Sequence, residues 1–311
     1  MIRRVCVVTP EYPGCGPSHG IGRVSATLAD ALTAAGIKVL VLASTDTGRF
    51  RIRGVRVDPC GPSDGPFLWR PLLSQAWLDH EIAAFDPDIV EGSNWGGLTA
   101  CLARQDRCIL RLSTSTALIP GEGLRRRLLR PLHLAWERRA VRRCRRLIAD
   151  SQVMAEQARR LYRRSSDAII SHAHAAAVSD ADPDARDLLF VGRLEARKGV
   201  DVLLAAWQAI ADRHRDRRLH LVGRDAAGFG KGSLARWPAA NVVVHGPLAD
   251  GHLAALRRRC AVQVVPSRFE SFGLVVLEAW AGGQVVVASD QGALPEVIGE
   301  AGLCTSLDAG G

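Results

Sequence analysis

The chain lacks several features that define large classes of protein. No apolar run approaches the roughly 18 residues that a membrane-spanning helix needs. The opening MIRRVCVVTPEY leads directly into a strand pattern, without the longer apolar stretch and small-residue cleavage site of a secretory signal. Internal repeats and low-complexity tracts are absent, and a hydrophobic content of 47% excludes a disordered chain. We therefore expect a folded protein of the cytoplasm.

Signals for disulfides and metal sites are also missing. The eight cysteines form no CxxC pair and no zinc-like spacing, so we expect free, buried thiols. The nine histidines form no HExxH or comparable cluster, and we expect His172 and His174 to be solvated. Three aspartate pairs have the DxD pattern that can bind Mn²⁺ or Mg²⁺: Asp86/Asp88, Asp180/Asp182 and Asp182/Asp184. Turn and capping roles account for all three, so we predict no metal and no cofactor.

Length and periodicity predict two α/β domains. A chain of 311 residues is long enough for two separate cores. Strand patterns alternate with helical patterns throughout, and repeated βα units form parallel sheets. We expect two Rossmann-like domains that face each other across a cleft, at residues 1–175 and 188–311. An Ala- and Asp-rich linker would join them at residues 176–187.

The predicted elements follow from hydrophobic periodicity. Strands of the first domain are expected at 4–9, 38–43, 88–91, 108–112, 147–149 and 168–171, with helices at 22–35, 73–84, 96–104, 132–146 and 152–163. Strands of the second are expected at 188–191, 219–222, 242–244, 261–265 and 285–288, with helices at 199–212, 250–258 and 273–281.

The most informative stretch is VVPSRFESFGLVVLEAWAGGQVVVASDQGALPEVI, residues 264–298. It reads as a strand end, a loop with Glu270, a helix that carries Glu278, and another strand. The free amides of Phe272, Gly273 and Leu274 at the start of that helix would form an anion site, helped by the helix dipole. An anion there would be flanked by two carboxylates that accept hydrogen bonds from hydroxyls. A sugar joined to a ribose through a diphosphate matches this layout.

A second motif is LLFVGRLEARKGVDVLLAAWQAI, residues 188–210. It predicts a strand, a basic turn and a helix, with Arg193 at the strand end and Lys198 at the helix start. Both cations can reach one point beyond the carboxyl end of the sheet, where open α/β sheets bind ligands. The alternative is that both are solvated. Lys198 is one of only three lysines, against 38 arginines.

A glycine-rich loop follows the first strand. Gly14, Gly16, Gly20 and Gly22 allow tight turns and close approach to a ligand, and the helix that starts near Gly22 would point its amides at the cleft. A dinucleotide site fits poorly, because the spacing is GxGxxxG and the glycines lie several residues beyond the strand.

The two motifs resemble the donor-binding motifs of retaining nucleotide-sugar glycosyltransferases of family 4, which have the GT-B fold. The resemblance implies that Glu270 contacts the donor sugar, that Glu278 contacts the ribose hydroxyls, and that the amides between them hold the diphosphate. It also implies that Arg193 and Lys198 neutralise the diphosphate as it leaves. The glycine-rich loop would lie between diphosphate and acceptor.

Further segments are assigned to the same donor site. The strand end His245-Gly246-Pro247-Leu248 is expected to line the base pocket through backbone groups. Asp290, Gly292 and Glu296 are expected to complete the donor-side wall. No side chain is well placed as a covalent nucleophile, so we expect attack on the face from which the diphosphate departs.

The chain departs from the family pattern at three places. Ser113 stands where many members have a histidine, so the role of that histidine is not carried over. SHAHAAA replaces the Asn-Gly turn that often precedes the linker. The sequence ends at GLCTSLDAGG, whereas members usually continue through further helices, so we expect a truncated second domain without those helices.

Residues 123–146 are strongly basic, with ten arginines and one acid, Glu137. We expect a helix that starts after Pro131, with arginines around an apolar stripe formed by Leu132, Trp136, Ala140 and Cys144. Three interpretations remain: a solvated face, docking on anionic lipid headgroups, or recognition of an anionic acceptor. Membrane-surface members of the resembled family use a basic helix in this domain. Nucleic acid is disfavoured because no aromatic residues interleave with the arginines.

The sequence therefore predicts a retaining glycosyltransferase that moves a hexose from a nucleoside-diphosphate sugar to a hydroxyl acceptor without a metal. The acceptor could be a glycan, a lipid or a small molecule. A peripheral position on the inner face of the membrane is a further expectation. Two alternatives stay open: a nucleotide-sugar epimerase of the same fold, and a non-catalytic nucleotide-sugar-binding or partner subunit.

Overall fold

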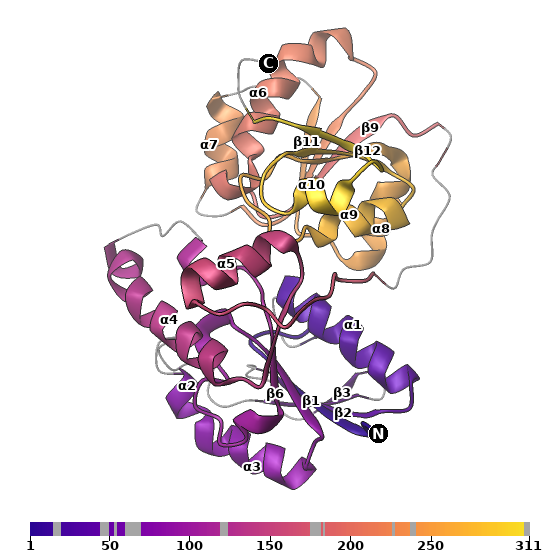
Figure 1. The fold of residues 1–311 in the computed structure, drawn as a ribbon. Helices are drawn as coiled ribbons and strands as arrows, with labels where there is room; N and C mark the ends of the chain where they lie inside the picture. Colours follow the sequence, from indigo (N-terminus) through magenta and orange to yellow (C-terminus); the bar gives the residue numbers. More distant parts are fainter. Residues whose placement is uncertain are drawn as a thin grey trace. The chain divides into compact units, whose positions relative to one another are not determined.

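The computed structural model describes residues 1–14, 20–43, 50–52, 55–59, 70–118, 124–174, 182, 184–225, 228–236 and 241–307. The chain divides into two compact units, unit 1 (Met1–His172) and unit 2 (Ala173–Gly311). Each unit is built on its own β-sheet, with helices on both faces (Figure 1). None of the described helices is long and apolar enough to cross a membrane.

Unit 1 has an eight-stranded sheet in the order β3-β4-β2-β1-β5-β6-β7-β8. Among the strands that the structure describes in this unit, only β3 and β4 pair in antiparallel fashion. Its strands are β1 (Arg4–Thr9), β2 (Lys38–Ala43), β3 (Phe50–Ile52), β4 (Val55–Pro59), β5 (Ile89–Ser93), β6 (Cys108–Arg111), β7 (Arg146–Ala149) and β8 (Ala168–Ile169). Its helices are α1 (Gly20–Ala34), α2 (Arg70–Leu73), α3 (Gln75–Phe85), α4 (Leu124–Arg143) and α5 (Gln152–Tyr162).

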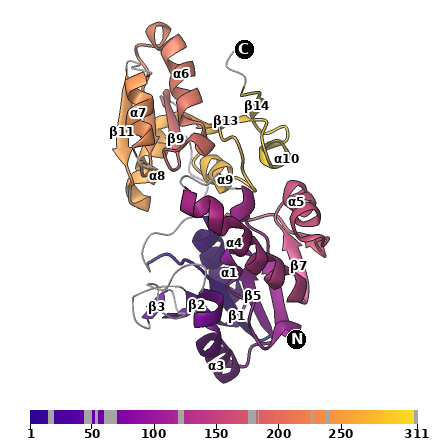
Figure 2. The same ribbon diagram turned by 90° about the vertical axis from the view of Figure 1, so that its left-hand side faces the viewer.

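Unit 2 has a six-stranded, fully parallel sheet in the order β11-β10-β9-β12-β13-β14. Its strands are β9 (Asp187–Val191), β10 (Leu219–Val222), β11 (Val242–Gly246), β12 (Cys260–Val265), β13 (Val285–Ser289) and β14 (Leu303–Thr305). Its helices are α6 (Val200–Ile210), α7 (Phe229–Arg236), α8 (Asp250–Arg259), α9 (Leu274–Ala281) and α10 (Leu294–Ile298). Figure 2 shows α10 and β14 on the β13 side of this sheet.

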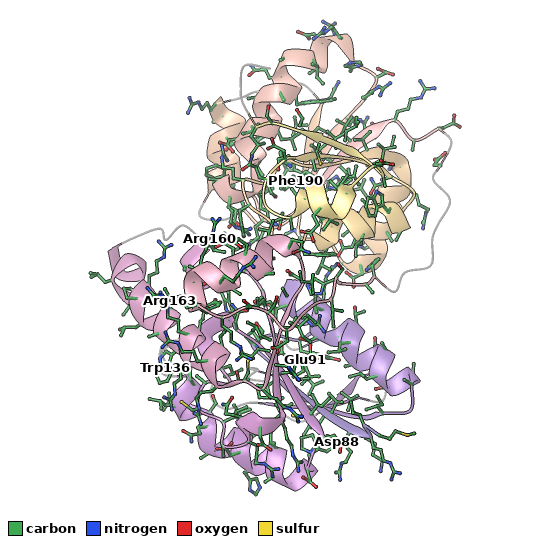
Figure 3. The ribbon with its side chains drawn as sticks, in the orientation of Figure 1. Asp88, Glu91, Trp136, Arg160, Arg163 and Phe190 are labelled. Carbon is green, nitrogen blue, oxygen red and sulfur yellow. The ribbon has the colours of Figure 1, made fainter. Side chains whose placement is uncertain are left out.

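The central strands of both sheets are apolar on both faces, as expected for parallel strands covered by helices. In unit 1, alternate residues of β1 and β2 pack under α1 and under α3. In unit 2, Phe190 of β9 (labelled in Figure 3) packs with α6 and α7. Its neighbour Leu189 packs with α8 on the other face. The cores therefore follow directly from the two-residue period of a strand.

The strand order fixes where a ligand can bind. In unit 2 the chain runs outward from β9 through β10 to β11, then crosses to β12 and runs outward through β13 to β14. The loops after β9 and β12 therefore start from neighbouring strands at the carboxyl edge where the order reverses, the position where doubly wound sheets bind ligands. Unit 1 has the same reversal between β1 and β5. The predicted Rossmann-like character of both halves is confirmed.

Predicted strands lie within about two residues of the observed ones, but the helix predicted at 96–104 is wrong. A 3₁₀ turn, Trp95–Gly97, followed by further turns, stands there. Gly96 and Gly97 both have a φ of 65°, and a Cβ on Gly97 would lie 2.6 Å from the backbone of Trp136. The two glycines thus prevent the predicted helix at the point where this segment contacts α4. Several short elements went unpredicted: β3, β4, α7, α10 and β14.

The predicted start of a helix after Pro131 is also wrong, because α4 begins at Leu124 and continues through that proline. Leu132, expected on the buried stripe, is 50% exposed, whereas Ala140 and Cys144 are buried as expected. A proline inside a helix destabilises it by about 3 kcal/mol. Packing of the later turns of α4 offsets this destabilisation, and that packing cannot be predicted from the local sequence. The predicted linker lies largely outside the described residues, and Asp187, assigned to it, begins β9.

Candidate functional site

Two residues predicted from separate motifs meet at the strand reversal of unit 2. Lys198 closes a 3₁₀ turn, Ala196–Lys198, after β9, and Glu270 lies in the loop after β12. The Nζ of Lys198 donates a hydrogen bond to Oε1 of Glu270. The hydroxyl of Ser267 donates to the same oxygen at 2.8 Å. A cation and a carboxylate therefore form one pair at the point where the strand order reverses.

Hydrogen bonds to backbone carbonyls hold the two loops together. The amide of Arg268 donates to the carbonyl of Arg197 at 2.8 Å, and Nη1 of Arg197 donates to the carbonyl of Phe269 at 3.2 Å. Gly199 has a φ of 69°, and a Cβ on it would lie 1.8 Å from the carbonyl oxygen of Pro266. Only glycine can occupy that position, so the ARKG sequence is what lets Lys198 approach the loop of Glu270.

Glu270 is a buried, ionised acceptor. Only 7% of the surface of this residue is exposed. Burial alone would raise its pKa, but the ammonium of Lys198, the guanidinium of Arg197 and the Ser267 hydroxyl together hold the pKa below its usual value. At neutral pH the group is therefore a carboxylate that can accept hydrogen bonds from ligand hydroxyls.

The start of α9 lies next to this pair in the chain. Gly273 is the N-cap residue with a φ of 96°, and Leu274 is the first residue of the helix. The side chain of Phe272 is buried. The structure thus places a helix start at the predicted residues, and anion binding by its amides stays a prediction.

The loop after β13 braces Glu270. The amide of Ala293 donates to the Glu270 carbonyl at 3.0 Å, and a Cβ on Gly292 would lie 2.3 Å from the same oxygen. Of the three residues predicted for this wall, Gly292 thus contacts the site. Asp290 and Glu296 are exposed.

The other predicted donor residues have partners that the sequence did not indicate. Glu278 accepts a hydrogen bond from Nη2 of Arg257 at 2.7 Å. Arg193 pairs with Glu195 at 3.1 Å, and Arg197 pairs with the same carboxylate at 3.0 Å. Arg193 shares the loop of Lys198, but its described ion pair is with Glu195.

The strand end at 245–248 lies at the same carboxyl edge. The amide of Gly223 donates to the Gly246 carbonyl at 2.9 Å, so the ends of β10 and β11 are adjacent. Leu248 packs against the apolar cluster beneath α8. The imidazole of His245 lies 2.8 Å from that of His220, which in turn lies 3.1 Å from the Asp187 carboxylate. Nothing in the spacing of these three residues predicted that they contact one another.

The glycine-rich loop belongs to unit 1. Gly20 begins α1, and the amide of Gly22 donates to Oε1 of Glu11 at 3.0 Å. An amide expected to point at a ligand is therefore bonded to this carboxylate. Gly14 has a φ of 87°, and Gly16 lies outside the described residues.

Ser113 belongs to a buried polar network at the carboxyl edge of unit 1. Its amide donates to Oδ1 of Asn94 at 2.7 Å. The amide nitrogen of Asn94 donates to the Tyr162 hydroxyl at 3.0 Å, and that hydroxyl donates to Glu137 at 2.8 Å. Ser115 donates to the same Glu137 oxygen at 2.6 Å. Glu137, the single acid of the basic segment, is thus fully buried.

The aspartates with DxD spacing have structural partners. Asp88 accepts from the amides of Arg3 and Arg4 at 2.7 and 2.9 Å, and Asp86 ends α3 with a φ of 44° (Asp88 is labelled in Figure 3). Asp182 accepts from the amide of Asp184 at 2.9 Å, and Asp180 lies outside the described residues. Asp86 and Asp182 thus have the predicted capping and turn roles, whereas Asp88 binds amides of a segment distant in the sequence.

Two smaller predictions need correction. His172 was expected to be solvated, but its Nε2 lies 3.3 Å from the buried carboxylate of Asp150, and its side chain is only 10% exposed. The described cysteines are free and five are buried, but Cys304 is exposed. Cys15 and Cys60 lie outside the described residues.

Comparisons with known proteins match both units of the chain. The family described as "Glycosyl transferases group 1" matches residues 185–309, and the family described as "Glycosyltransferase Family 4" matches residues 18–171. A D-inositol 3-phosphate glycosyltransferase of Corynebacterium aurimucosum is 39% identical over 37% of this chain and 30% of its own length. A phosphatidyl-myo-inositol mannosyltransferase of Mycobacterium tuberculosis is 37% identical over 44% of this chain and 37% of its own length. The matched stretch thus spans about a third of these relatives.

Solved structures match nearly the whole chain. Sucrose-phosphate synthase from Thermosynechococcus elongatus aligns with a TM-score of 0.77 at 21% identity, over 98% of this chain and 86% of that one. Anabaena HepE, solved in complex with UDP and glucose, aligns with a TM-score of 0.72 at 18% identity, over 98% and 86%. The two family matches follow one another along the chain and coincide with its two Rossmann-like units, so the chain belongs to the family 4-like glycosyltransferases of GT-B fold.

Proposed function

We propose that the chain binds a nucleoside-diphosphate sugar in unit 2 and transfers its hexose to a hydroxyl acceptor with retention of configuration. The observation that carries the proposal is the contact of Lys198 with Glu270 at the strand reversal of the sheet. The names of the relatives support it, since they are glycosyltransferases that act on inositol compounds, and the HepE structure contains UDP and glucose.

Each residue type suits one part of such a donor. Lys198, Arg193 and the amides at the start of α9 supply positive charge for the diphosphate, so the proposal requires no metal. Glu270 accepts from a sugar hydroxyl, and Glu278 accepts from the ribose. The bond from the sugar carbon to the phosphate oxygen breaks, the bond to the acceptor oxygen forms on the same face, and the acceptor proton passes to the departing diphosphate.

Calorimetric titration with UDP, GDP and ADP, each with Mg²⁺ and with EDTA, tests the donor site. We expect one nucleotide to bind equally well in both conditions, after which its sugars can be tested for transfer and for the configuration of the product. Lys198→Met should weaken binding by about 10-fold or more, because a charge-assisted hydrogen bond is lost. Lys231→Met is the matched control, because Lys231 is an exposed lysine on α7. Failure of all three nucleotides to bind would contradict the proposal.

A second candidate is a subunit that binds the donor without transferring the sugar. The observation that favours it is Ser113, whose amide and hydroxyl are both bonded to Asn94. Retained nucleotide binding, with neither transfer nor hydrolysis of any sugar of that nucleotide, would favour this candidate over the enzyme.

We also propose that α4 docks on an anionic membrane surface. Leu128 and Leu132 are 67% and 50% exposed on this helix, one turn apart, and exposed arginines such as Arg130 and Arg142 lie on the same element. Exposed leucines beside arginines suit an interface with anionic lipid. We expect co-sedimentation with vesicles of phosphatidylcholine and phosphatidylglycerol but not of phosphatidylcholine alone. Leu128→Ser/Leu132→Ser should abolish it, and Arg215→Glu in unit 2 should not; equal behaviour with both vesicles would contradict docking.

A further inference from the structure

Arg257 is the one arginine that is buried in the part of the chain that the structure describes, with an exposure of 6%. It lies in the last turn of α8. The next residue, Arg258, is exposed, as are most arginines of this chain. Burial of a guanidinium is unfavourable unless it is paired and fully hydrogen-bonded, so its partners show what holds it there.

Three side-chain oxygens lie within hydrogen-bond distance of the guanidinium of Arg257. Its Nη2 donates to Oε2 of Glu278 at 2.7 Å. Its Nη1 lies 3.3 Å from Oε1 of Gln263 and 3.3 Å from Oε1 of Gln284. Glu278 comes from α9, Gln263 from β12 and Gln284 from the turn before β13. The fork of one arginine thus joins three neighbouring elements.

The two glutamines are themselves held by the sheet. Nε2 of Gln263 donates to the carbonyl of Leu189 in β9 at 3.0 Å. Nε2 of Gln284 donates to the carbonyl of Cys260 in β12 at 3.1 Å. Because the amide nitrogen can only donate and the amide oxygen can only accept, both oxygens are directed at the guanidinium. The position of Arg257 is therefore set by backbone groups of the sheet.

The end of α9 leaves room for this side chain. Gly282 follows the helix, and a Cβ on it would lie 3.4 Å from Cβ and 3.6 Å from Cδ of Arg257. The stem of Arg257 thus passes directly beside Gly282.

We propose that Arg257 is a positioning residue that holds the carboxylate of Glu278 in place to read the ribose hydroxyls of the donor. This inference rests on the proposed function. A glutamate on a helix has three rotatable bonds, and a planar fork anchored to the sheet restricts them. A carboxylate has about four acceptor sites, so the bond from Arg257 is compatible with further bonds from ribose hydroxyls.

The alternative is that Arg257 and Glu278 form an ion pair that only stabilises the fold. The two roles differ in what they do to ligand discrimination. A purely stabilising pair affects all ligands of the site alike. A positioning residue affects only ligands that carry the hydroxyls that Glu278 reads. A ratio of affinities therefore separates the roles, and it does not depend on the fraction of protein that is folded.

The experiment compares each of UDP, GDP and ADP with its 2′,3′-dideoxy counterpart by calorimetry. The variants are Arg257→Met, Arg257→Lys, Glu278→Gln and the matched control Arg258→Met on the same helix. We expect the unaltered chain to prefer the ribonucleotide by about 10-fold or more, the loss expected for hydrogen bonds to a charged group. Arg257→Met and Glu278→Gln should bring the ratio near one. Arg258→Met should leave it unchanged.

Each outcome has a distinct meaning. Weaker binding of both ligands by Arg257→Met, with an unchanged ratio, would show a purely stabilising role and overturn the inference. A ratio of one in the unaltered chain would overturn it while leaving the donor site intact. Failure of the unaltered chain to bind any of the three nucleotides would instead overturn the proposed function. If Arg257→Met does not fold, Arg257→Lys, which keeps the charge but loses the planar fork, should still lower the ratio; an undiminished ratio would overturn the inference.

Discussion

Gly292 lies against the main chain of Glu270, so close that a Cβ would stand 2.3 Å from its carbonyl oxygen and 2.8 Å from its amide nitrogen. The two residues lie in loops that follow the neighbouring strands β12 and β13. The amide of the next residue, Ala293, donates to the same carbonyl. The loop after β13 thus determines where the loop after β12 holds the carboxylate of Glu270.

The first prediction concerns this contact. Gly292→Ala places a methyl group inside the Glu270 backbone at a φ of 63°, so the loop of Glu270 must move. We expect a loss of about 2 kcal/mol or more in the free energy of unfolding, together with weaker nucleotide binding. Gly36→Ala is the control, because its φ is 80° with nothing within 4 Å of the added Cβ. It should cost only about 1 kcal/mol and leave binding unchanged, and equal losses in both variants would contradict the prediction.

A second prediction concerns the Lys198–Glu270 pair. Lys198→Met leaves a buried carboxylate without its ammonium partner, which should cost about 3–5 kcal/mol in urea denaturation. Adding Glu270→Gln removes the unpaired charge and should recover part of that loss. The double-mutant cycle should therefore give a clear coupling energy, whereas additive effects would show that the two groups do not interact in solution.

The pH dependence of stability follows from the lowered pKa of Glu270. Since this pKa is lower in the folded than in the unfolded chain, the ionised group stabilises the fold above its ordinary value of 4.5. That contribution is lost as the pH falls below 4.5 toward the folded-state pKa. Glu270→Gln should therefore lose less stability than the unaltered chain between about pH 7 and about pH 3.5. Parallel losses in the two proteins would contradict the assignment.

The buried network of unit 1 gives a fourth prediction. Burial, and then the nearby charge of Glu137, raise the pKa of Tyr162, so its hydroxyl stays protonated and donates to Glu137. Tyr162→Phe removes that donor and leaves Asn94 without its acceptor, which should cost about 1–3 kcal/mol. Nucleotide affinity, assigned to unit 2, should stay the same. A stability change below about 0.5 kcal/mol, typical of surface positions, would show that the network is not formed.

Thiol reactivity provides a fifth prediction. Burial raises the pKa of both Cys108 and Cys260 to about 12, whereas Cys304 is exposed. We expect iodoacetamide at neutral pH to modify Cys304 first among the described cysteines, with mass spectrometry locating the label. Its rate should stay below that of a free cysteine, because partial burial and the charge of Asp290 raise its pKa as well. Labelling of Cys108 at a similar rate would contradict the described core.

The parts of the fold that the sequence predicted well are those set by local pattern. The strands β1, β2 and β10 were predicted to the residue, because each is a short apolar run bounded by polar or turn residues. The helix through Pro131 was missed because a local rule ends helices at proline, while the packing that overrides it comes from residues far along the chain. Gly96 and Gly97 carried a signal against the predicted helix, since two adjacent glycines favour a turn.

The candidate site shows the same division. Lys198 and Glu270 were both predicted, because a basic turn after one strand and an acid before a helix are local features. The partners of three other residues were not predicted: Arg257 for Glu278, His220 for His245, and Tyr162 for Glu137. Each of these pairs is more than 20 residues apart in the sequence, and nothing in residue type or spacing connects its members.

By itself, then, the sequence determined the alternation of strands and helices, the two Rossmann-like halves and the identity of the residues at the carboxyl edge of the second sheet. Those features depend on hydrophobic period and turn chemistry, which act over a few residues. Only the tertiary structure decided which charges are buried and what each one contacts. Arg257 and Arg258 are neighbours of the same type on one helix, yet one is buried against Glu278 and the other is exposed, because α9 and the sheet pack on only one face of α8.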